Sequence, residues 1–222
     1  MLLAEAGDPG RPCVIVCAGV HGDEPAGPAA LLSLLEDGLL DDRFSYRLFP
    51  CTNPTGLLAG SRENAEGRDV NRSFGRGGLT PESKAIIIAN RDRRFVLALD
   101  LHEDPQAVGF YCYEPAGQTP IGPAVICAVD AAALPVATFT PGFDLGYPHD
   151  AEHLRRLERG RVVADFEEES KLPAGLPFSL YISKKAARRV LTLESPGTLS
   201  WIDRIATLRV AVVAAIAALV AK

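Results

Sequence analysis

The sequence lacks paired cysteine motifs, a signal-peptide pattern and an apolar run long enough to span a membrane. Its five cysteines are scattered and form no CxxC pair, so we expect reduced, buried thiols and a cytoplasmic protein. The first residues contain no basic stretch ahead of an apolar run, which a signal peptide would require. The C-terminal apolar run, 210–221, is 12 residues long, whereas a membrane-spanning helix needs roughly 18 to 20. We therefore expect no membrane association.

Basic residues are also fewer than acidic ones. The 23 Lys and Arg residues are outnumbered by 28 Asp and Glu, which gives a net charge of -5. Nucleic-acid binding needs a basic surface, so we expect no nucleic-acid partner. The hydrophobic fraction of 47% is ordinary for a globular protein. At 222 residues, the sequence favours a single domain over 1–222.

Strand-like and helix-like patterns alternate along the chain. Short apolar runs predict strands at 13–20, 46–54, 95–104, 110–115, 135–141 and 190–197. Apolar residues at helical spacing predict helices at 24–38, 80–91, 119–133 and 201–222. The segments 53–79 and 141–178 are rich in glycine, proline and charge and are expected to be irregular. The alternation predicts an α/β fold with a mixed, mostly parallel twisted sheet flanked by helices.

Three of the predicted strands end in "VHGDE", "DLHED" and "TLESPG". In α/β sheets ligands bind just beyond the carboxyl ends of the strands. His21 and Glu24 lie close enough in sequence to hold one ion, and His102 can supply a third ligand. Imidazole nitrogens and a carboxylate suit Zn²⁺, and three protein ligands leave one position open for catalysis. The alternative is that HxxE occurs by chance and that these histidines cap or pack.

The loop "SRENAEGRDVNRSFG" contributes Arg62, Arg68, Asn71 and Arg72. Guanidinium groups match carboxylates in shape and charge, so the loop predicts an anionic substrate. The alternative is a solvated charged loop. Glu194 ends an apolar strand and is placed to act as a general base beside a metal, or else it caps the following turn.

Taken in order, these stretches resemble the zinc carboxypeptidase superfamily, including its succinylglutamate desuccinylase and aspartoacylase relatives. The matching stretches are "GVHGDEPAG", "NPTGLLAGSRENAEGRDVNRSFG", "DLHED" and "LTLESPG", which span 19–197. The resemblance implies a zinc-carboxypeptidase-like fold with one zinc ion. It implies that the zinc ligands are His21, Glu24 and His102.

The same resemblance assigns roles to the remaining site residues. Asp69 orients a ligand histidine, and Asn71 with Arg72 holds the substrate carboxylate. Arg62 polarises the scissile carbonyl, and Glu194 acts as general base and then as proton donor. The carboxypeptidase tyrosine that covers the substrate has no clear counterpart. Tyr147 and Tyr181 are candidates, and an ordinary packed or surface tyrosine is the alternative for each.

The implied function is zinc-dependent removal of a C-terminal residue from a small peptide. The first alternative is a deacylase acting on N-acyl amino acids, because both reactions need the same ligands, base and carboxylate contact. The second is a binding protein on a degenerate scaffold, although all the motif residues are present. The pair His149 and His153 and the basic segment 184–189 are interpreted as surface features. Oligomeric state is left open.

Overall fold

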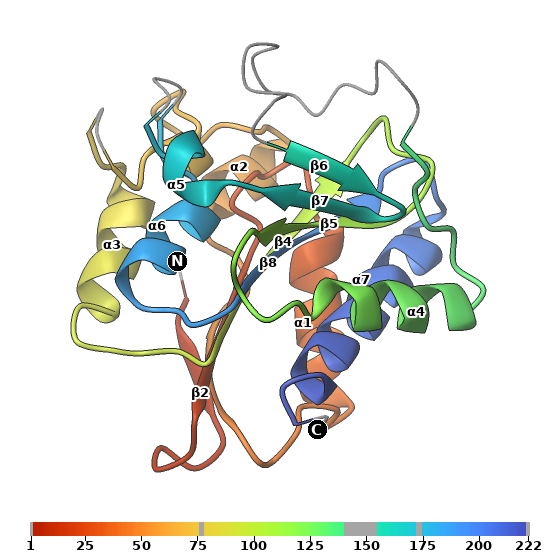
Figure 1. The fold of residues 1–222 in the computed structure, drawn as a ribbon. Helices are drawn as coiled ribbons and strands as arrows, with labels where there is room; N and C mark the ends of the chain where they lie inside the picture. The colour runs from red at the N-terminus through yellow and green to blue at the C-terminus, as the bar shows by residue number, and fades with distance from the viewer. Residues whose placement is uncertain (1, 76–77, 140–154, 172–174, 221–222) are drawn as a thin grey trace.

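The computed structural model describes residues 2–75, 78–139, 155–171 and 175–220. Within them an eight-stranded sheet crosses the middle of the molecule (Figure 1). Its strands are β1 (Ala4–Ala6), β2 (Cys13–Ala18), β3 (Ser45–Phe49), β4 (Leu97–Asp104), β5 (Tyr111–Pro115), β6 (Arg155–Glu158), β7 (Arg161–Ala164) and β8 (Val190–Pro196). They lie in the order β1-β3-β2-β4-β8-β5-β7-β6. The central β3, β2, β4 and β8 run parallel, while β1 and β5 are antiparallel to their neighbours β3 and β8. The prediction of a mixed, mostly parallel sheet is confirmed.

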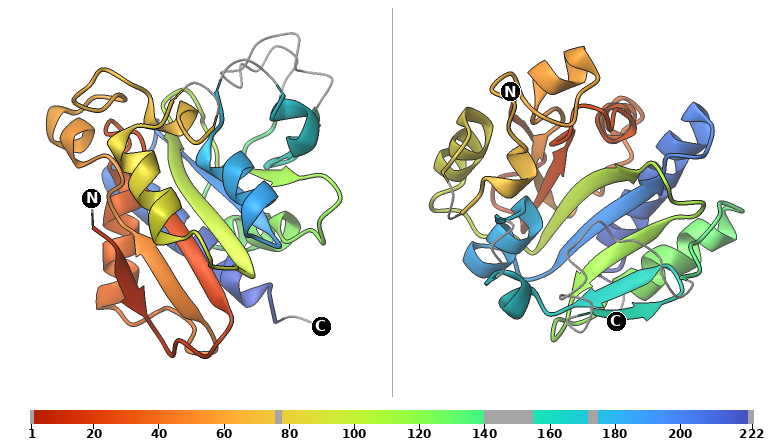
Figure 2. Two further views of the ribbon diagram at one scale, coloured as in Figure 1. Left: turned by 90° about the vertical axis from the view of Figure 1, so that its left-hand side faces the viewer. Right: turned by 90° about the horizontal axis from the view of Figure 1, so that it is seen from above.

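Helices cover both faces of the sheet (Figures 1 and 2). One face carries α1 (Ala26–Glu36), α4 (Gly122–Ala131) and α7 (Trp201–Ala217). The other carries α3 (Pro81–Ala89) and α6 (Phe178–Lys185). Shorter elements are α2 (Pro54–Ala59), the 3₁₀ turn η1 (Val70–Arg72) and α5 (Phe166–Glu169). No helix in the described ranges is long and apolar enough to cross a membrane.

The continuous apolar run of β2 reflects burial on both sides. Val14 and Val16 pack into the core beneath α1 and α7, while Ile15 and Cys17 face the core beneath α3 and α6. Alternate side chains of a strand project to opposite faces, so a strand covered on both sides has no polar face. This burial fixes β2 at the centre and brings its carboxyl end beside that of β4.

The starts of α3 and α1 differ in how their first amide groups are satisfied. Thr80 caps α3, accepting a hydrogen bond from the backbone of Ser83, with Pro81 in the first turn. Pro25 offers α1 no side-chain cap. Instead the backbone N–H of Ala26 donates to Glu103 Oε1 on β4, at 2.6 Å. A carboxylate at this position also interacts favourably with the positive end of the helix dipole.

Three sequence-based predictions need correction. The thiols were expected to be buried, but Cys127 is exposed, and only Cys17 and Cys112 are fully buried. No strand runs through 135–139, where Val136 makes one isolated bridge to Phe110. The reason is that β5 already has β8 on one side and β7 on the other, so its edges are occupied beyond Phe110. The segments expected to be irregular contain short elements, among them α2, β6 and β7. These are only four to six residues long, too short for a clear periodicity.

Candidate metal centre and substrate cavity

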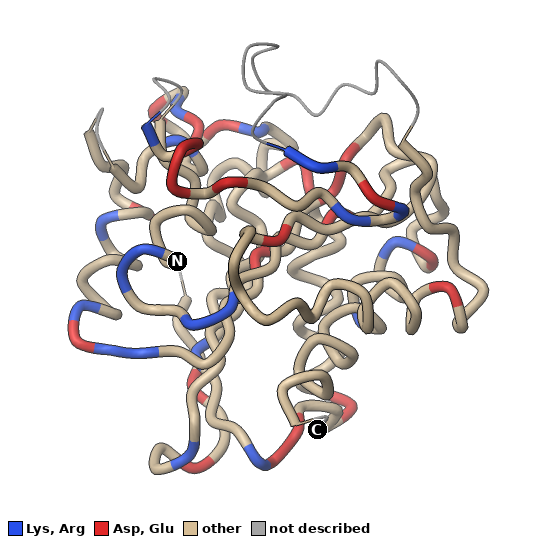
Figure 3. Tube along the Cα trace, viewed as in Figure 1, with Lys and Arg blue, Asp and Glu red and all other residues tan. Residues whose placement is uncertain are grey.

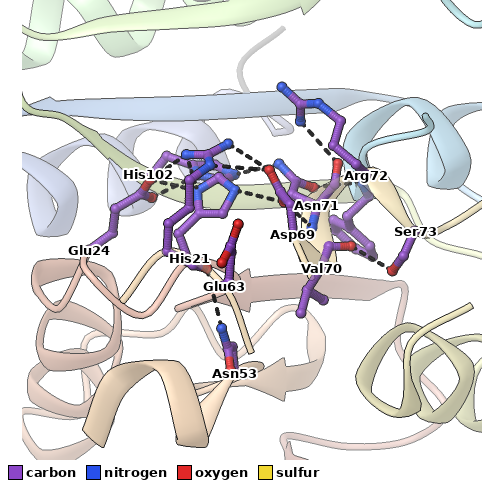
Figure 4. A network of polar contacts seen from close by, with 12 residues as sticks. His21, Glu24, Asn53, Glu63, Asp69, Val70, Asn71, Arg72, Ser73 and His102 are labelled. Carbon is purple, nitrogen blue, oxygen red and sulfur yellow. Dashed lines mark hydrogen bonds and ion pairs between the residues drawn. The ribbon is translucent and has the colours of Figure 1, made fainter. Parts of the chain in front are cut away.

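Three buried side chains from separate elements meet at the carboxyl ends of β2 and β4. His21 follows β2, Glu24 lies just before α1, and His102 is in β4. One potential ligand atom from each lies within 4.8 Å of the others. His21 Nδ1 is 2.6 Å from Glu24 Oε1, and His102 Nδ1 is 2.8 Å from Glu24 Oε2. Figure 4 shows the three side chains converging. The group could hold a metal ion, as the sequence predicted.

The outer nitrogens of the two histidines face carboxylates. His21 Nε2 lies 3.3 Å from Asp69 Oδ1, and His102 Nε2 lies 3.2 Å from Asp100 Oδ2. Carboxylates at this position keep the proton on Nε2 and leave Nδ1 available as a ligand. Both oxygens of Asp100 are buried without a hydrogen-bond partner among the described residues. A buried carboxylate in this state is costly unless positive charge lies close by, and a cation held by His102 would supply it.

The pKa values within the group also indicate a site built for positive charge. Burial opposes the charge on His21, but Glu24 and Asp69 outweigh it and raise the pKa of His21. Burial likewise opposes ionisation of Glu24, yet His102 and His21 hold the pKa of that carboxyl far below its usual range. Without a metal, these shifts, with the raised pKa of His102, favour protonation of the imidazoles beside an ionised carboxylate. A divalent ion would displace those protons.

Glu194 lies directly beside His102 across the sheet. The two are register partners between β4 and β8, and Tyr111 of β5 is the register partner of Glu194 on the other side. Paired residues of neighbouring strands project to the same face, so these three side chains form a row. Burial raises the pKa of Glu194 to about 8, and the charges of Glu24 and Asp104 add to this while His102 opposes it.

Arg62 is held next to the ligands by Asp69. Its Nε and Nη2 donate to Asp69 Oδ2 at 3.1 and 2.9 Å. Its Nη1 lies 3.3 Å from His21 Nδ1 and 3.8 Å from Glu24 Oε1. Asp69 Oδ1 also accepts from the backbone of Asn71, which begins η1. Asp69 therefore connects His21, Arg62 and the start of η1, and its orienting role stays a prediction.

Asn71 and Arg72 reach the same region from η1. Asn71 Oδ1 accepts from the backbone of Phe178 at 2.9 Å, and its Nδ2 lies 3.3 Å from His102 Nε2. Arg72 Nη1 donates to the carbonyl of Asn71 at 3.0 Å. The amide of Asn71 is thus fixed by the backbone of α6, and its Nδ2 lies beside a candidate ligand, where it can also face a substrate. Their role as a carboxylate site stays a prediction.

A cavity of ≈ 380 Å³ brings the site together. Every predicted site residue except Asp69 lines it. The sequence reasoning passed over other lining residues, including Tyr111, Tyr113, Thr192 and Arg204. Strand alternation could have found Thr192 and Asp100, since each lies two residues before a predicted site residue on the same strand face. Tyr111 and Arg204 carry no comparable local signal.

Several other candidates lie elsewhere. Tyr181 packs against the ring of Phe74, with 5.9 Å between ring centres, and is not among the cavity residues. Arg68 donates to the carbonyls of Gly78 and Leu79, so it fastens its own loop. Tyr147, His149 and His153 lie outside the described residues.

The basic residues of 184–189 gather near those of 91–94 (Figure 3). The backbone N–H of Arg188 donates to the carbonyl of Phe95, which joins the two segments. They precede β8 and β4, whereas the cavity lies at the other ends of these strands. An eight-residue strand such as β4 spans roughly 25 Å. Their assignment as a surface feature apart from the cavity is consistent with this position.

Comparison with known families finds a match over most of the site. Residues 11–133 match the family model described as the succinylglutamate desuccinylase/aspartoacylase catalytic domain. Carboxypeptidase D of Rattus norvegicus is 31% identical over 116 residues, covering 42% of this chain and 8% of the relative. Carboxypeptidase SOL1 of Arabidopsis thaliana is 31% identical over 112 residues, covering 41% and 23%. The matched region thus amounts to less than a quarter of the length of these curated relatives.

Solved structures are similar over nearly the whole chain. A provisionally named metallopeptidase of Shewanella amazonensis has a TM-score of 0.73 and 23% identity, covering 95% of this chain and 79% of that one. A metallo-carboxypeptidase of Burkholderia cenocepacia has a TM-score of 0.66 and 19% identity, covering 97% and 60%. At these identities the likeness establishes the fold.

Proposed function

Because the chain belongs to the succinylglutamate desuccinylase/aspartoacylase family of the zinc carboxypeptidase-like superfamily, we propose that it is a zinc-dependent metallocarboxypeptidase. It would hydrolyse the last amide bond of a small peptide that has a free C-terminal carboxylate. Residues 1–222 would form one catalytic domain. The observation that carries the proposal is the group His21, Glu24 and His102, with Glu194 in register beside His102 and two arginines in the same cavity.

The ligands of the ion would be His21, Glu24 and His102, a donor set of two imidazoles and a carboxylate. This set, with its outer histidine nitrogens facing Asp69 and Asp100, suits zinc. When bound, zinc supplies Lewis acidity to the substrate carbonyl and lowers the pKa of water near it toward about 7. The protein's own residues would transfer the proton, stabilise the developing charge and bind the substrate.

Glu194 would accept a proton from the attacking water as the new C–O bond forms. It would return that proton to the amine nitrogen as the C–N bond breaks. Its place beside His102 on the neighbouring strand supports this role, and its raised pKa favours a group that can hold the proton between the two steps. Arg62, fixed by Asp69, would stabilise the negative charge that develops on the carbonyl oxygen.

Arg72 and Asn71 would bind the terminal carboxylate and so select the bond next to it. A guanidinium with an adjacent amide matches a carboxylate in both charge and hydrogen-bond geometry. Both residues line the cavity beside the candidate ligands, which supports the assignment. An amide lacking that carboxylate should therefore be a poor substrate.

A deacylase acting on N-acyl amino acids is the second candidate, and the family match favours it. The names of the curated relatives favour the peptidase. The two reactions differ in what lies on the acyl side of the bond and share the ligands, the base and the carboxylate site.

Product identification by mass spectrometry separates the two functions. The zinc-loaded protein is given short peptides with varied C-terminal residues and, separately, N-acetyl and N-succinyl amino acids, with Glu194→Gln as control. Release of single C-terminal residues by the wild type alone is the expected result. Cleavage restricted to the acylated amino acids would establish the deacylase. Failure to bind zinc or to cleave either set would overturn both and leave a binding protein on this scaffold.

A further inference from the structure

A third arginine reaches the cavity from the opposite side of the sheet. Arg204 is in the first turns of α7 and lines the cavity together with Arg72 of η1. The helix α7 packs on one sheet face, and η1 lies on the side of α3 and α6. The strand ends that carry His102 and Glu194 lie between these two sides, so positive charge flanks the candidate metal centre on both.

The guanidinium of Arg204 is only partly engaged. Its Nη1 donates to Glu103 Oε2 at 2.7 Å, while Nε is buried without a partner among the described residues. The other oxygen of Glu103 accepts from the backbone of Ala26. One carboxylate therefore serves both the start of α1 and the arginine. Glu103 accepts from only one nitrogen of this guanidinium, so the exposed part of the group keeps N–H donors that an acceptor entering the cavity can use.

The surroundings hold this guanidinium in place. The Trp201 ring covers it, with 5.2 Å from the guanidinium carbon to the ring centre, a stacking contact favoured by arginine. Beside it the loops after β4 and β8 are in close contact, and a Cβ added at Gly197 would lie 2.7 Å from Pro105 Cα. Gly197 and Pro105 both line the cavity. A side chain with 23% exposure in such a setting is positioned for recognition.

We propose that Arg204 forms a second anion subsite, which binds a carboxylate on the acyl side of the scissile amide. The inference rests on the proposed function, since the direction of the substrate follows from Arg72 holding its terminal carboxylate. With the scissile carbonyl at the metal centre, the acyl portion extends toward α7. The preferred substrate then carries two carboxylates, one on each side of the bond that breaks. The second comes either from an acidic residue before the bond or from a dicarboxylic acyl group.

Two matched pairs of substrates test this proposal, all ending in the C-terminal residue that the enzyme prefers. One pair is N-acetyl-glutamyl and N-acetyl-glutaminyl peptide, and the other is succinyl and succinamoyl amino acid. Each pair replaces one carboxylate by a carboxamide of the same shape. We expect kcat/KM to be about 10- to 100-fold higher for the acidic member of at least one pair. The pair that responds identifies the source of the carboxylate.

The variant Arg204→Gln should bring that ratio close to one, and Arg204→Lys should give an intermediate value. Because the ratio compares two substrates on the same preparation, a smaller folded fraction cancels. Arg209→Gln is the matched control: it removes a guanidinium from the same helix that is paired with Asp37, and Arg209 is not among the cavity residues. The control should keep the wild-type ratio.

The outcomes separate the inference from the function on which it rests. A wild-type ratio near one in both pairs overturns the subsite and leaves the hydrolase standing, and this result needs no variant. A preference that survives in both Arg204 variants assigns it to another group and also overturns the subsite. If the zinc-loaded wild type cleaves none of the four compounds or the peptide panel, the proposed function itself fails.

Discussion

At the scale of single residues, the two histidines of the candidate metal centre use their ring nitrogens in the same way. In each ring Nδ1 faces Glu24 and Nε2 faces a carboxylate, Asp69 for His21 and Asp100 for His102. The carboxylates come from different elements, a loop and a strand. Each imidazole is therefore oriented independently, so loss of one support should leave the other ring in place.

Asp100→Asn should weaken zinc binding by about 10- to 100-fold, because it removes the charge that supports His102. Competition with a chelator of known affinity measures the change. Asp23→Asn is the control, since Asp23 is an exposed acid next to Glu24 that lines the cavity and makes no hydrogen bond to either histidine. Equal losses in the two variants would indicate a general effect of charge and contradict the orienting role.

Glu194 gives the metal-free protein a pH-dependent stability. Its folded-state pKa of about 8 lies above the usual 4.5, so the folded protein holds this proton more tightly than the unfolded chain does. The destabilisation is absent below about pH 4.5, grows as pH rises through this window and is complete above about pH 8. In the presence of chelator, Glu194→Gln should therefore have a higher Tm than wild type at pH 8.5, by at least roughly 2–4 °C.

At pH 4.5 the two Tm values should nearly coincide, since Glu194 is then protonated in the folded protein and about half protonated in the unfolded chain. Scanning calorimetry at the two pH values gives the comparison. Glu36→Gln, which changes an exposed residue at the end of α1, should not produce a gap that grows with pH. A gap of constant size for Glu194→Gln would mean that burial does not shift its titration.

The sequence predicts those site residues that directly follow a strand-like apolar run. His21, Glu24, His102 and Glu194 each follow an apolar run, and strand polarity predicts that such ends meet. Glu103 and Arg204 were not assigned a role in the site, because their pairing joins β4 to α7 across about a hundred positions of sequence. A local sequence pattern cannot predict this contact, because it forms only when α7 packs against the sheet.

At the scale of elements, the loop that carries His21 and Glu24 is held against α2 by two glycines. A Cβ added at Gly22 would lie 1.9 Å from the carbonyl carbon of Gly56 and 2.2 Å from the backbone nitrogen of Leu57. Only a residue without a side chain allows this approach of backbone to backbone. The contact sets the distance between the candidate ligands and the segment that leads to Arg62.

Gly22→Ala should displace this loop, lowering zinc affinity by about tenfold or more and stability by about 1–3 kcal/mol, as expected for a forced steric overlap. Zinc titration and urea unfolding report the two effects. Gly10→Ala is the control, because the nearest atom to its added Cβ is a side-chain oxygen of Asp8 at 3.4 Å. Normal zinc binding in Gly22→Ala would contradict a positioning role for the glycine pair.

The longer elements follow from the sequence, and the short ones do not. The helix predicted at 80–91 is α3, because Thr80 and Pro81 mark its start. The strand predicted at 135–141 fails through 135–139 because strand formation depends on a free partner edge, which periodicity does not reveal. In the same way the 3₁₀ turn η1 depends on Asp69, whose carboxylate caps it while also contacting Arg62 and His21.

At the scale of the whole molecule, the site lies at the edge of a tightly packed two-sided sheet. The helix α7 buries its apolar face against α1, α4 and the central strands. Leu208 is fully buried there, whereas Val213 of the same helix is 39% exposed. The stability of the sheet, and with it the spacing of the site, therefore depends on the buried side of α7.

Leu208→Ala should lower the free energy of unfolding by about 2–5 kcal/mol, since it leaves a cavity in the core. Val213→Ala removes apolar atoms from the same helix at an exposed position and should cost well under 1 kcal/mol. Urea unfolding of the two variants measures the difference. Similar losses would mean that α7 contributes through its helical length and not through the core.

The pairing of His102 with Glu194 sets how this site can change over evolution. Insertions and deletions in loops can alter the reach of Arg62 and Arg72 while the sheet stays intact. A one-residue insertion in β8 would turn Glu194 to the other face of the sheet and remove the base in a single step. Substrate preference can therefore change through changes in loop length. The distance from Glu194 to the metal centre changes only if the pairing of β4 and β8 changes.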